Sequence, residues 1–176
     1  MITKDNLEEH IKEFGLRTSL IEAKSYFGNN KKDLIGAELG VDVGNNAESM
    51  LKHLDIKLLH LIDSYDRGHL YDPVKLPYEK CKERVDNYNV VFHIKTTKEA
   101  VNEIDDSSLD FCYVDADHSY TACLEDCILY YPKVMSGGVI CGHDYNMDSV
   151  KKAVGEFALG IEKEVNFDGM DWWIFK

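Results

Sequence analysis

Two apolar stretches of this chain each end in side chains that can bind metals or move protons, and they lie one helix-length apart. Asp115 closes the stretch 109–114, and His143 and Asp144 close the stretch 138–142. If both stretches form neighbouring parallel strands, these three side chains meet at the carboxyl ends of the strands. In an open α/β sheet that edge is where ligands bind. The spacing therefore predicts a functional site at this edge.

Strand and helix signals alternate along most of the chain. The pattern predicts strands at 34–39, 58–62, 90–94, 109–114 and 139–141. It predicts helices at 45–54, 78–88, 97–104, 120–134 and 149–159. Alternation within 161–167, followed by the apolar segment 171–176, indicates a closing antiparallel hairpin. Together these elements predict a mostly parallel α/β sheet with helices on both faces.

The region before the first strand predicts two short helices. Capping-box patterns start them, with Asp5 and Glu8 in one and Ser19 and Glu22 in the other, and Gly28 ends the second. We therefore expect an N-terminal helical extension over 1–33 and one domain over 34–176. A length of 176 residues with 44% apolar residues suffices for a single core.

The net charge of −12 disfavours nucleic acid as a partner, because an acidic surface repels phosphate backbones. The five cysteines include no Cys-x-x-Cys pair, and no apolar run approaches membrane-spanning length. We expect a cytoplasmic protein with reduced cysteines and no membrane association.

The turn after the first strand contains two glycines, Gly40 and Gly44, which let a ligand approach the backbone closely. A dinucleotide fingerprint would need a glycine where Asp42 stands. That carboxylate would repel a pyrophosphate and, with Glu38, would suit a cationic ligand. S-adenosylmethionine carries an ammonium and a sulfonium, and its carboxylate could reach the helix start at Asn46. The alternative is that the glycines only shape a tight turn.

Polar residues also follow the second and third strands. Asp63 lies 23 residues after Gly40, where an acid commonly binds a ribose hydroxyl pair. Thr97 lies in a loop that could edge an adenine. A solvated loop aspartate and an ordinary helix cap are the respective alternatives.

Four segments together resemble class I S-adenosylmethionine-dependent methyltransferases. They are Glu38-x-Gly40-x-x-x-Gly44, Asp63, the run from Val114 to Tyr120, and the run from Gly137 to Tyr145. The chain is most similar to the bacterial branch with macrocin-type and novobiocin-type sugar O-methyltransferases, whose metal-dependent members bind a divalent ion. The resemblance runs from about residue 34 to the C-terminus.

This resemblance implies a Rossmann-like, doubly wound seven-stranded sheet in the order 3-2-1-4-5-7-6 with strand seven antiparallel. It implies cofactor contacts at Glu38, Gly40, Asp42, Asn46, Asp63, Ser64 and Thr97, with Gly44 in the same turn. It also implies metal ligands at Asp115, His143 and Asp144. His143 departs from the family, which usually has a carboxylate there.

Methyl transfer to oxygen requires an aligned hydroxyl and a group that helps to remove its proton. We expect Asp115 and Asp144 to bind magnesium or manganese, with His143 as third ligand or as base. His118 is the second candidate base. In the alternatives, Asp115 caps a helix or faces the cofactor, His118 is a surface histidine, and His143 and Asp144 form a metal-free acid–base pair.

The sequence thus predicts an S-adenosylmethionine-dependent methyltransferase that methylates oxygen on a small hydroxylated acceptor. A nicotinamide-dependent oxidoreductase and a non-catalytic cofactor-binding module are the other hypotheses. The loop 65–77 either helps to cover the acceptor or is a plain connection. Because the chain is short, its acceptor pocket is open, small or completed by a second subunit in a homo-oligomer.

Overall fold

The computed structural model describes residues 15–28, 31–66 and 77–176. Its helices are α2 (Thr18–Phe27), α3 (Asn45–His53), α4 (Pro77–Val85), α5 (Thr97–Ala100), α6 (Tyr120–Tyr130) and α7 (Asp148–Gly160), with 3-10 turns η2 (Val101–Glu103) and η3 (Tyr131–Lys133). Its strands are β1 (Leu34–Leu39), β2 (Ile56–Ile62), β3 (Val90–His93), β4 (Leu109–Val114), β5 (Val134–Gly142), β6 (Asn166–Asp168) and β7 (Asp171–Phe175). The predicted first helix and nearly all of the predicted loop 67–77 lie outside the described residues.

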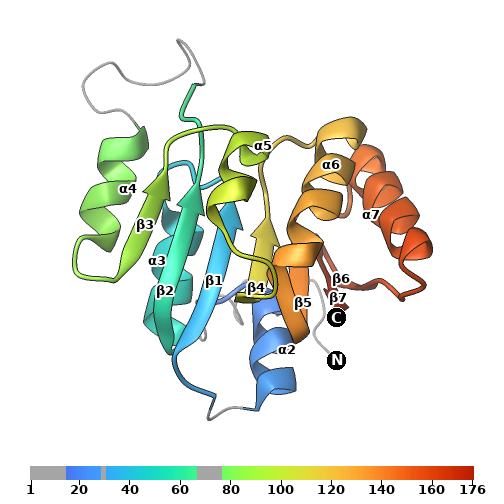
Figure 1. Cartoon of the computed structure of the whole chain (residues 1–176), viewed down its shortest axis with the longest axis horizontal. Coiled ribbons are helices and arrows are strands. Elements are labelled where there is room, and N and C mark those ends of the chain that lie inside the picture. The colour runs from blue at the N-terminus through green and yellow to red at the C-terminus, as the bar shows by residue number, and fades with distance from the viewer. Residues whose placement is uncertain (1–14, 29–30, 67–76) are drawn as a thin grey trace.

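The seven strands form one sheet in the order β3-β2-β1-β4-β5-β7-β6, which confirms the predicted topology (Figure 1). Strands β1 to β5 pair in parallel, whereas β7 is antiparallel to both β5 and β6. Every residue of β4 is buried, as expected for a central strand covered on both faces. The carboxyl ends of β1, β2, β4 and β5 therefore meet at one edge of the sheet.

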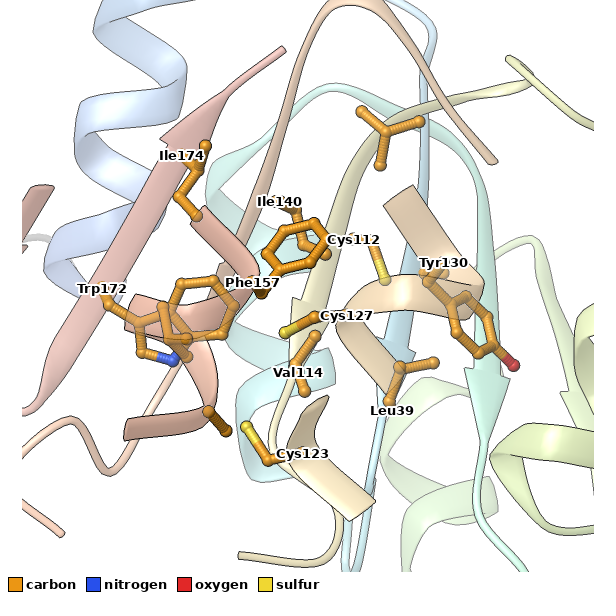
Figure 2. Close-up of a cluster of buried hydrophobic side chains, with 14 of the residues drawn as sticks. Leu39, Cys112, Val114, Cys123, Cys127, Tyr130, Ile140, Phe157, Trp172 and Ile174 are labelled. Atoms are coloured by element: carbon orange, nitrogen blue, oxygen red, sulfur yellow. The ribbon is translucent and has the colours of Figure 1, made fainter. Parts of the chain in front are cut away.

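Helices cover both faces of the sheet and enclose two apolar cores. Figure 2 shows the first core, where side chains of the sheet such as Cys112, Ile140 and Trp172 pack against Tyr130 of α6 and Phe157 of α7. The second core joins the other face to α2, α3 and α4 through residues such as Leu20, Met50, Cys81, Phe111 and Trp173. Trp172 and Trp173 are thus both buried, on opposite faces.

All five cysteines are buried and have free thiols. Cys123 and Cys127 belong to the first core, as expected for small apolar side chains on one helix face. Among the described residues, no helix is long and apolar enough to cross a membrane.

Several element boundaries differ from the predictions by a few residues, and the differences around α6, β5 and α7 have a clear physical cause. The helix predicted to reach Val134 ends at Tyr130, because Pro132 lies in a 3-10 turn and Val134 already pairs with Leu109. Strand β5 is correspondingly longer than 139–141. The segment 161–165 is not a strand, because Ile161 donates its N–H to the carbonyl of Phe157 and so finishes α7. Its alternating apolar residues instead pack against the first core.

Candidate active site

The turn after β1 is shaped by its glycines. Gly40 has φ of 82°, and a Cβ built there would lie 2.1 Å from the carbonyl oxygen of Asp115. Gly44 has φ of 79°, and a Cβ there would lie 2.6 Å from Sγ of Cys81. Both positions therefore require glycine for backbone conformation and for close packing. Asp42 is also left-handed, with φ of 51°.

Glu38 lies at the end of β1, beneath this turn, and is completely buried. Its Oε1 accepts a hydrogen bond of 2.9 Å from Nδ2 of Asn46, the second residue of α3. Among the described residues, its Oε2 has no hydrogen-bond partner. Burial, more than any neighbouring charge, raises the pKa of Glu38 from 4.5 to about 8. The site therefore has a buried acceptor atom that a cationic or hydrogen-bond-donating ligand would satisfy.

Asp63 binds backbone amides of the same turn. Its Oδ2 accepts from the N–H groups of Val41 and Asp42, each at 2.9 Å, and its Oδ1 accepts from the N–H of Tyr65 at 2.7 Å. This carboxylate thus joins the end of β2 to the turn after β1, in addition to facing the cleft described next. The sequence indicated that Asp63 faces a ligand, but it contained no signal for its hydrogen bonds to the turn after β1.

A cleft of about 730 Å³ lies at the carboxyl ends of β1, β2 and β4. Four of the predicted cofactor residues line it, namely Gly40, Asp63, Ser64 and Thr97. The remaining walls come from Ile62, Lys95, Thr96, Lys98, Ala116, Asp117, His118, Ala122 and Glu125. Its volume falls within the range of ligand pockets, about 300–1,000 Å³. The cleft is therefore large enough for a nucleoside-sized ligand.

Asp115, His118 and Asp144 come together beside this cleft. Nε2 of His118 lies 3.3 Å from Oδ1 of Asp115 and 3.0 Å from Oδ2 of Asp144. Asp115 follows β4, and Asp144, in left-handed conformation with φ of 57°, lies two residues after β5. Burial is the largest cause of a raised pKa at Asp115, and the nearby histidines oppose it. The two carboxylates and the imidazole offer one ligand atom each within 4.8 Å of one another.

His143 lies beside this group and faces a different partner. Its Nδ1 is 3.3 Å from Oδ2 of Asp144, whereas its Nε2 is 2.9 Å from Nη1 of Arg17. Within the described residues, the group that could hold a metal contains His118 in place of the predicted His143. The sequence pattern favoured His143 because it adjoins Asp144. The observed difference arises because the loop after β4 turns His118 back towards both carboxylates.

Arg17 and Asp171 are two residues of this region that the sequence analysis did not identify. Arg17 precedes α2, and Asp171 begins β7, so neither lies at the end of a parallel strand. Asp171 accepts hydrogen bonds from the backbone N–H and the hydroxyl of Ser19. An Arg immediately before a helix is too common to have marked this contact.

A family model described as a methyltransferase domain matches residues 37–145, which include the turn after β1 and the His118–Asp144 group. A protein of Acanthamoeba polyphaga mimivirus, named uncharacterized protein R132, is 28% identical over 155 residues, covering 78% of this chain and 67% of the relative.

Among solved structures, the O-methyltransferase NovP aligns with a TM-score of 0.65 and 22% identity, over 88% of this chain and 76% of that chain. An O-methyltransferase from Bacillus cereus in complex with SAH aligns with a TM-score of 0.61 and 13% identity, over 100% and 93%. These two likenesses concern the fold. With the family model matching more than half of its residues, the chain belongs to the methyltransferase-domain family and has the Rossmann-like fold of S-adenosylmethionine-dependent methyltransferases.

Proposed function

We propose that this protein transfers the methyl group of S-adenosylmethionine to a hydroxyl oxygen of a small acceptor molecule. The observation that carries the proposal is the group formed by Asp115, His118 and Asp144 beside the cleft. A binding module would need the cleft alone, whereas proton removal from a hydroxyl needs groups such as these at its rim. The net charge of −12 supports a small molecule over a nucleic acid as acceptor.

The residues of the cleft fit S-adenosylmethionine. Glu38, buried at the end of β1 beside the cleft, has an Oε2 without a partner among the described residues, which suits the cationic methionine portion. Asp63 lies in the cleft wall, where a ribose hydroxyl would donate to it. Thr97 and Lys98 line the part of the cleft that follows β3, where the adenine ring of the cofactor would lie. When bound, the cofactor supplies a methyl group on a positively charged sulfur. For transfer, the residues around the cleft would have to hold the cofactor with this methyl directed at the acceptor oxygen.

The group formed by Asp115, His118 and Asp144 suits a divalent cation. Two carboxylates with one imidazole favour manganese, iron or zinc over magnesium. Such an ion lowers the pKa of a hydroxyl that it binds. A metal-free mechanism is the second candidate. Nε2 of His118 contacts both carboxylates and would carry the ring proton, which leaves Nδ1 as the atom that could accept the hydroxyl proton.

Cofactor binding is tested by calorimetry with S-adenosylhomocysteine and, separately, with NAD. We expect the wild-type protein to bind the first and not the second. Asp63→Asn should weaken binding of S-adenosylhomocysteine about tenfold or more, a loss of about 1.4 kcal/mol, because the ribose loses a charged acceptor. The amide retains one oxygen for the turn, so the fold should persist. Asp66→Asn, an exposed neighbour, is the matched control.

Equal affinity of Asp63→Asn and wild type would remove the ribose role from Asp63. Binding of NAD in place of S-adenosylhomocysteine would overturn the methyltransferase proposal and favour the oxidoreductase. Circular dichroism of both variants checks that each has folded before the affinities are compared.

Metal binding is tested by titrating Mn²⁺ into the protein and following the free ion by electron paramagnetic resonance. We expect His118→Ala to lower Mn²⁺ affinity about tenfold or more, because one of three ligands is lost. His53→Ala, an exposed histidine of α3, should leave the affinity unchanged. If the wild type binds no Mn²⁺, the metal is excluded and the metal-free mechanism is favoured. If His118→Ala binds Mn²⁺ as well as the wild type does, His118 is not a ligand.

A further inference from the structure

Arg17, at the start of α2, contacts His143 beside the group formed by Asp115, His118 and Asp144. Its backbone is the N-cap of this helix, and α2 packs against β5 and β7. The guanidinium therefore lies on the face of the sheet opposite α6 and α7, and its Nη1 is 2.9 Å from Nε2 of His143. The contact joins residues 126 positions apart in sequence.

The contact decides which nitrogen of His143 carries the proton. A guanidinium has only N–H donors and remains charged in proteins, so Nε2 of His143 must be the acceptor. In the neutral imidazole the proton then resides on Nδ1. Nδ1 is the atom that faces Oδ2 of Asp144, at 3.3 Å. His143 can thus accept from Arg17 while its Nδ1–H lies on the side of Asp144.

The surroundings hold the ring of His143 in this orientation. Its side chain is only 11% exposed, and its carbonyl oxygen accepts a hydrogen bond of 3.2 Å from Nε1 of Trp172. Oδ1 of Asp171 lies 3.9 Å from Nε2, beyond hydrogen-bonding distance, while its Oδ2 is bound by Ser19. Because Arg17 and Ser19 belong to the same helix start, α2 fixes both groups together.

We propose that Arg17 is a positioning residue that keeps His143 in its Nδ1–H tautomer and so directs this N–H at Asp144. The lone pair of Nε2 is occupied by Arg17, which leaves His118 as the other imidazole of this group among the described residues. The start of α2 thereby completes the site, although it lies outside the segment 37–145 that matches the family model. The consequence for methyl transfer rests on the proposed function, but the tautomer itself does not.

The tautomer is measured by ¹H–¹⁵N correlation spectra of protein labelled at histidine nitrogens, at a pH of about 8, above the ordinary histidine pKa of about 6.5. In the wild type we expect a protonated Nδ1 and an unprotonated Nε2 for His143, assigned by the loss of its signals in His143→Gln. In Arg17→Ala these two signals should exchange or average. Arg17→Lys retains a donor and should restore the wild-type pattern at least in part.

Glu22→Gln is the matched control, because Glu22 is an exposed residue of the same helix. It should leave the His143 signals unchanged and so separate the role of Arg17 from a general disturbance of α2. A wild-type spectrum with a protonated Nε2 overturns the proposal without any variant. An unchanged spectrum in Arg17→Ala overturns it as well.

The measurement needs neither acceptor, cofactor nor metal. A wild-type protein that binds no S-adenosylhomocysteine would therefore contradict the proposed function, while the spectrum would still decide the role of Arg17. Conversely, normal cofactor binding together with a protonated Nε2 would retain the proposed function and reject this role.

Discussion

Buried carboxyl groups dominate the site at the scale of single residues. Glu38 is completely buried and Asp63 nearly so, while Asp115 and Asp144 retain about a fifth of their side-chain exposure. Burial raises the pKa of both Glu38 and Asp115. A carboxyl group in this condition is stabilised by a positive partner, whether a metal ion or an organic cation. The chemistry of these residues therefore favours cationic ligands before any comparison with relatives.

Glu38 makes stability depend on pH in a defined direction. Its pKa in the folded state, about 8, lies above its ordinary value of 4.5. Between these values the folded protein holds a proton that the unfolded chain releases, so this contribution to stability is complete below about pH 4.5 and is lost as the pH rises towards 8. Glu38→Gln keeps an oxygen for Asn46 and removes the titration.

Urea unfolding at a series of pH values checks this prediction. The free energy of unfolding of the wild type should fall relative to that of Glu38→Gln as the pH rises through this window. Parallel profiles for the two proteins would show that Glu38 titrates normally. Asp66→Asn, at an exposed carboxylate, provides the comparison for a simple change in net charge.

At the scale of elements, two helices begin without the side-chain caps that their sequences favour. Ser19, predicted as part of a capping box, instead binds Asp171, and α2 begins after Arg17 without a side-chain cap. Helix α3 likewise has no side-chain cap, because its N-cap is Gly44, in left-handed conformation. In both cases the position of the helix is set by packing around the site, which overrides local capping preference.

The start of α5 is a case where capping does hold an element in place. Thr96 and Glu99 form a reciprocal capping box, and Thr96 and Thr97 both line the cleft. Thr96→Ala should lower the free energy of unfolding by about 1 kcal/mol, because an N–H of the first turn loses its acceptor. Denaturant unfolding measures the loss. Thr96→Ser retains the hydroxyl and should recover most of it, and equal stability of all three proteins would contradict the cap.

At the scale of the whole molecule, the regular alternation of strand and helix signals predicted the mostly parallel α/β sheet, whereas the strand order, now observed, was implied by the resemblance to methyltransferases. Buried strands such as 34–39 and 109–114 were predicted with their observed limits, since the chain is apolar there except for one carboxylate in each. The segment 161–165 misled the prediction because a loop that packs against a core can alternate as a strand does. An alternating pattern indicates only which residues are buried. Backbone pairing is needed to distinguish a strand from a loop that packs against the core.

The site was predictable where it depends on strand ends and unpredictable where it depends on tertiary packing. Asp115 and Asp144 follow neighbouring parallel strands, so their convergence required only the topology. The choice between His118 and His143 depends on the path of one loop and on Arg17, 126 residues away in sequence from His143. Whether this group binds an ion stays a prediction until the Mn²⁺ titration is done.

The place of β7 in the sheet has a consequence for how the chain acquires its structure. This strand is inserted between β5 and β6, although it follows both in sequence. Until residues 171–175 are made, the outer backbone groups of β5 have no partner, and the indole of Trp172 has not yet filled its place beside Gly142. A chain whose synthesis stops at this stage would expose an unpaired strand edge and apolar surface, both of which favour aggregation. Rapid completion of β7 should therefore protect the protein during synthesis.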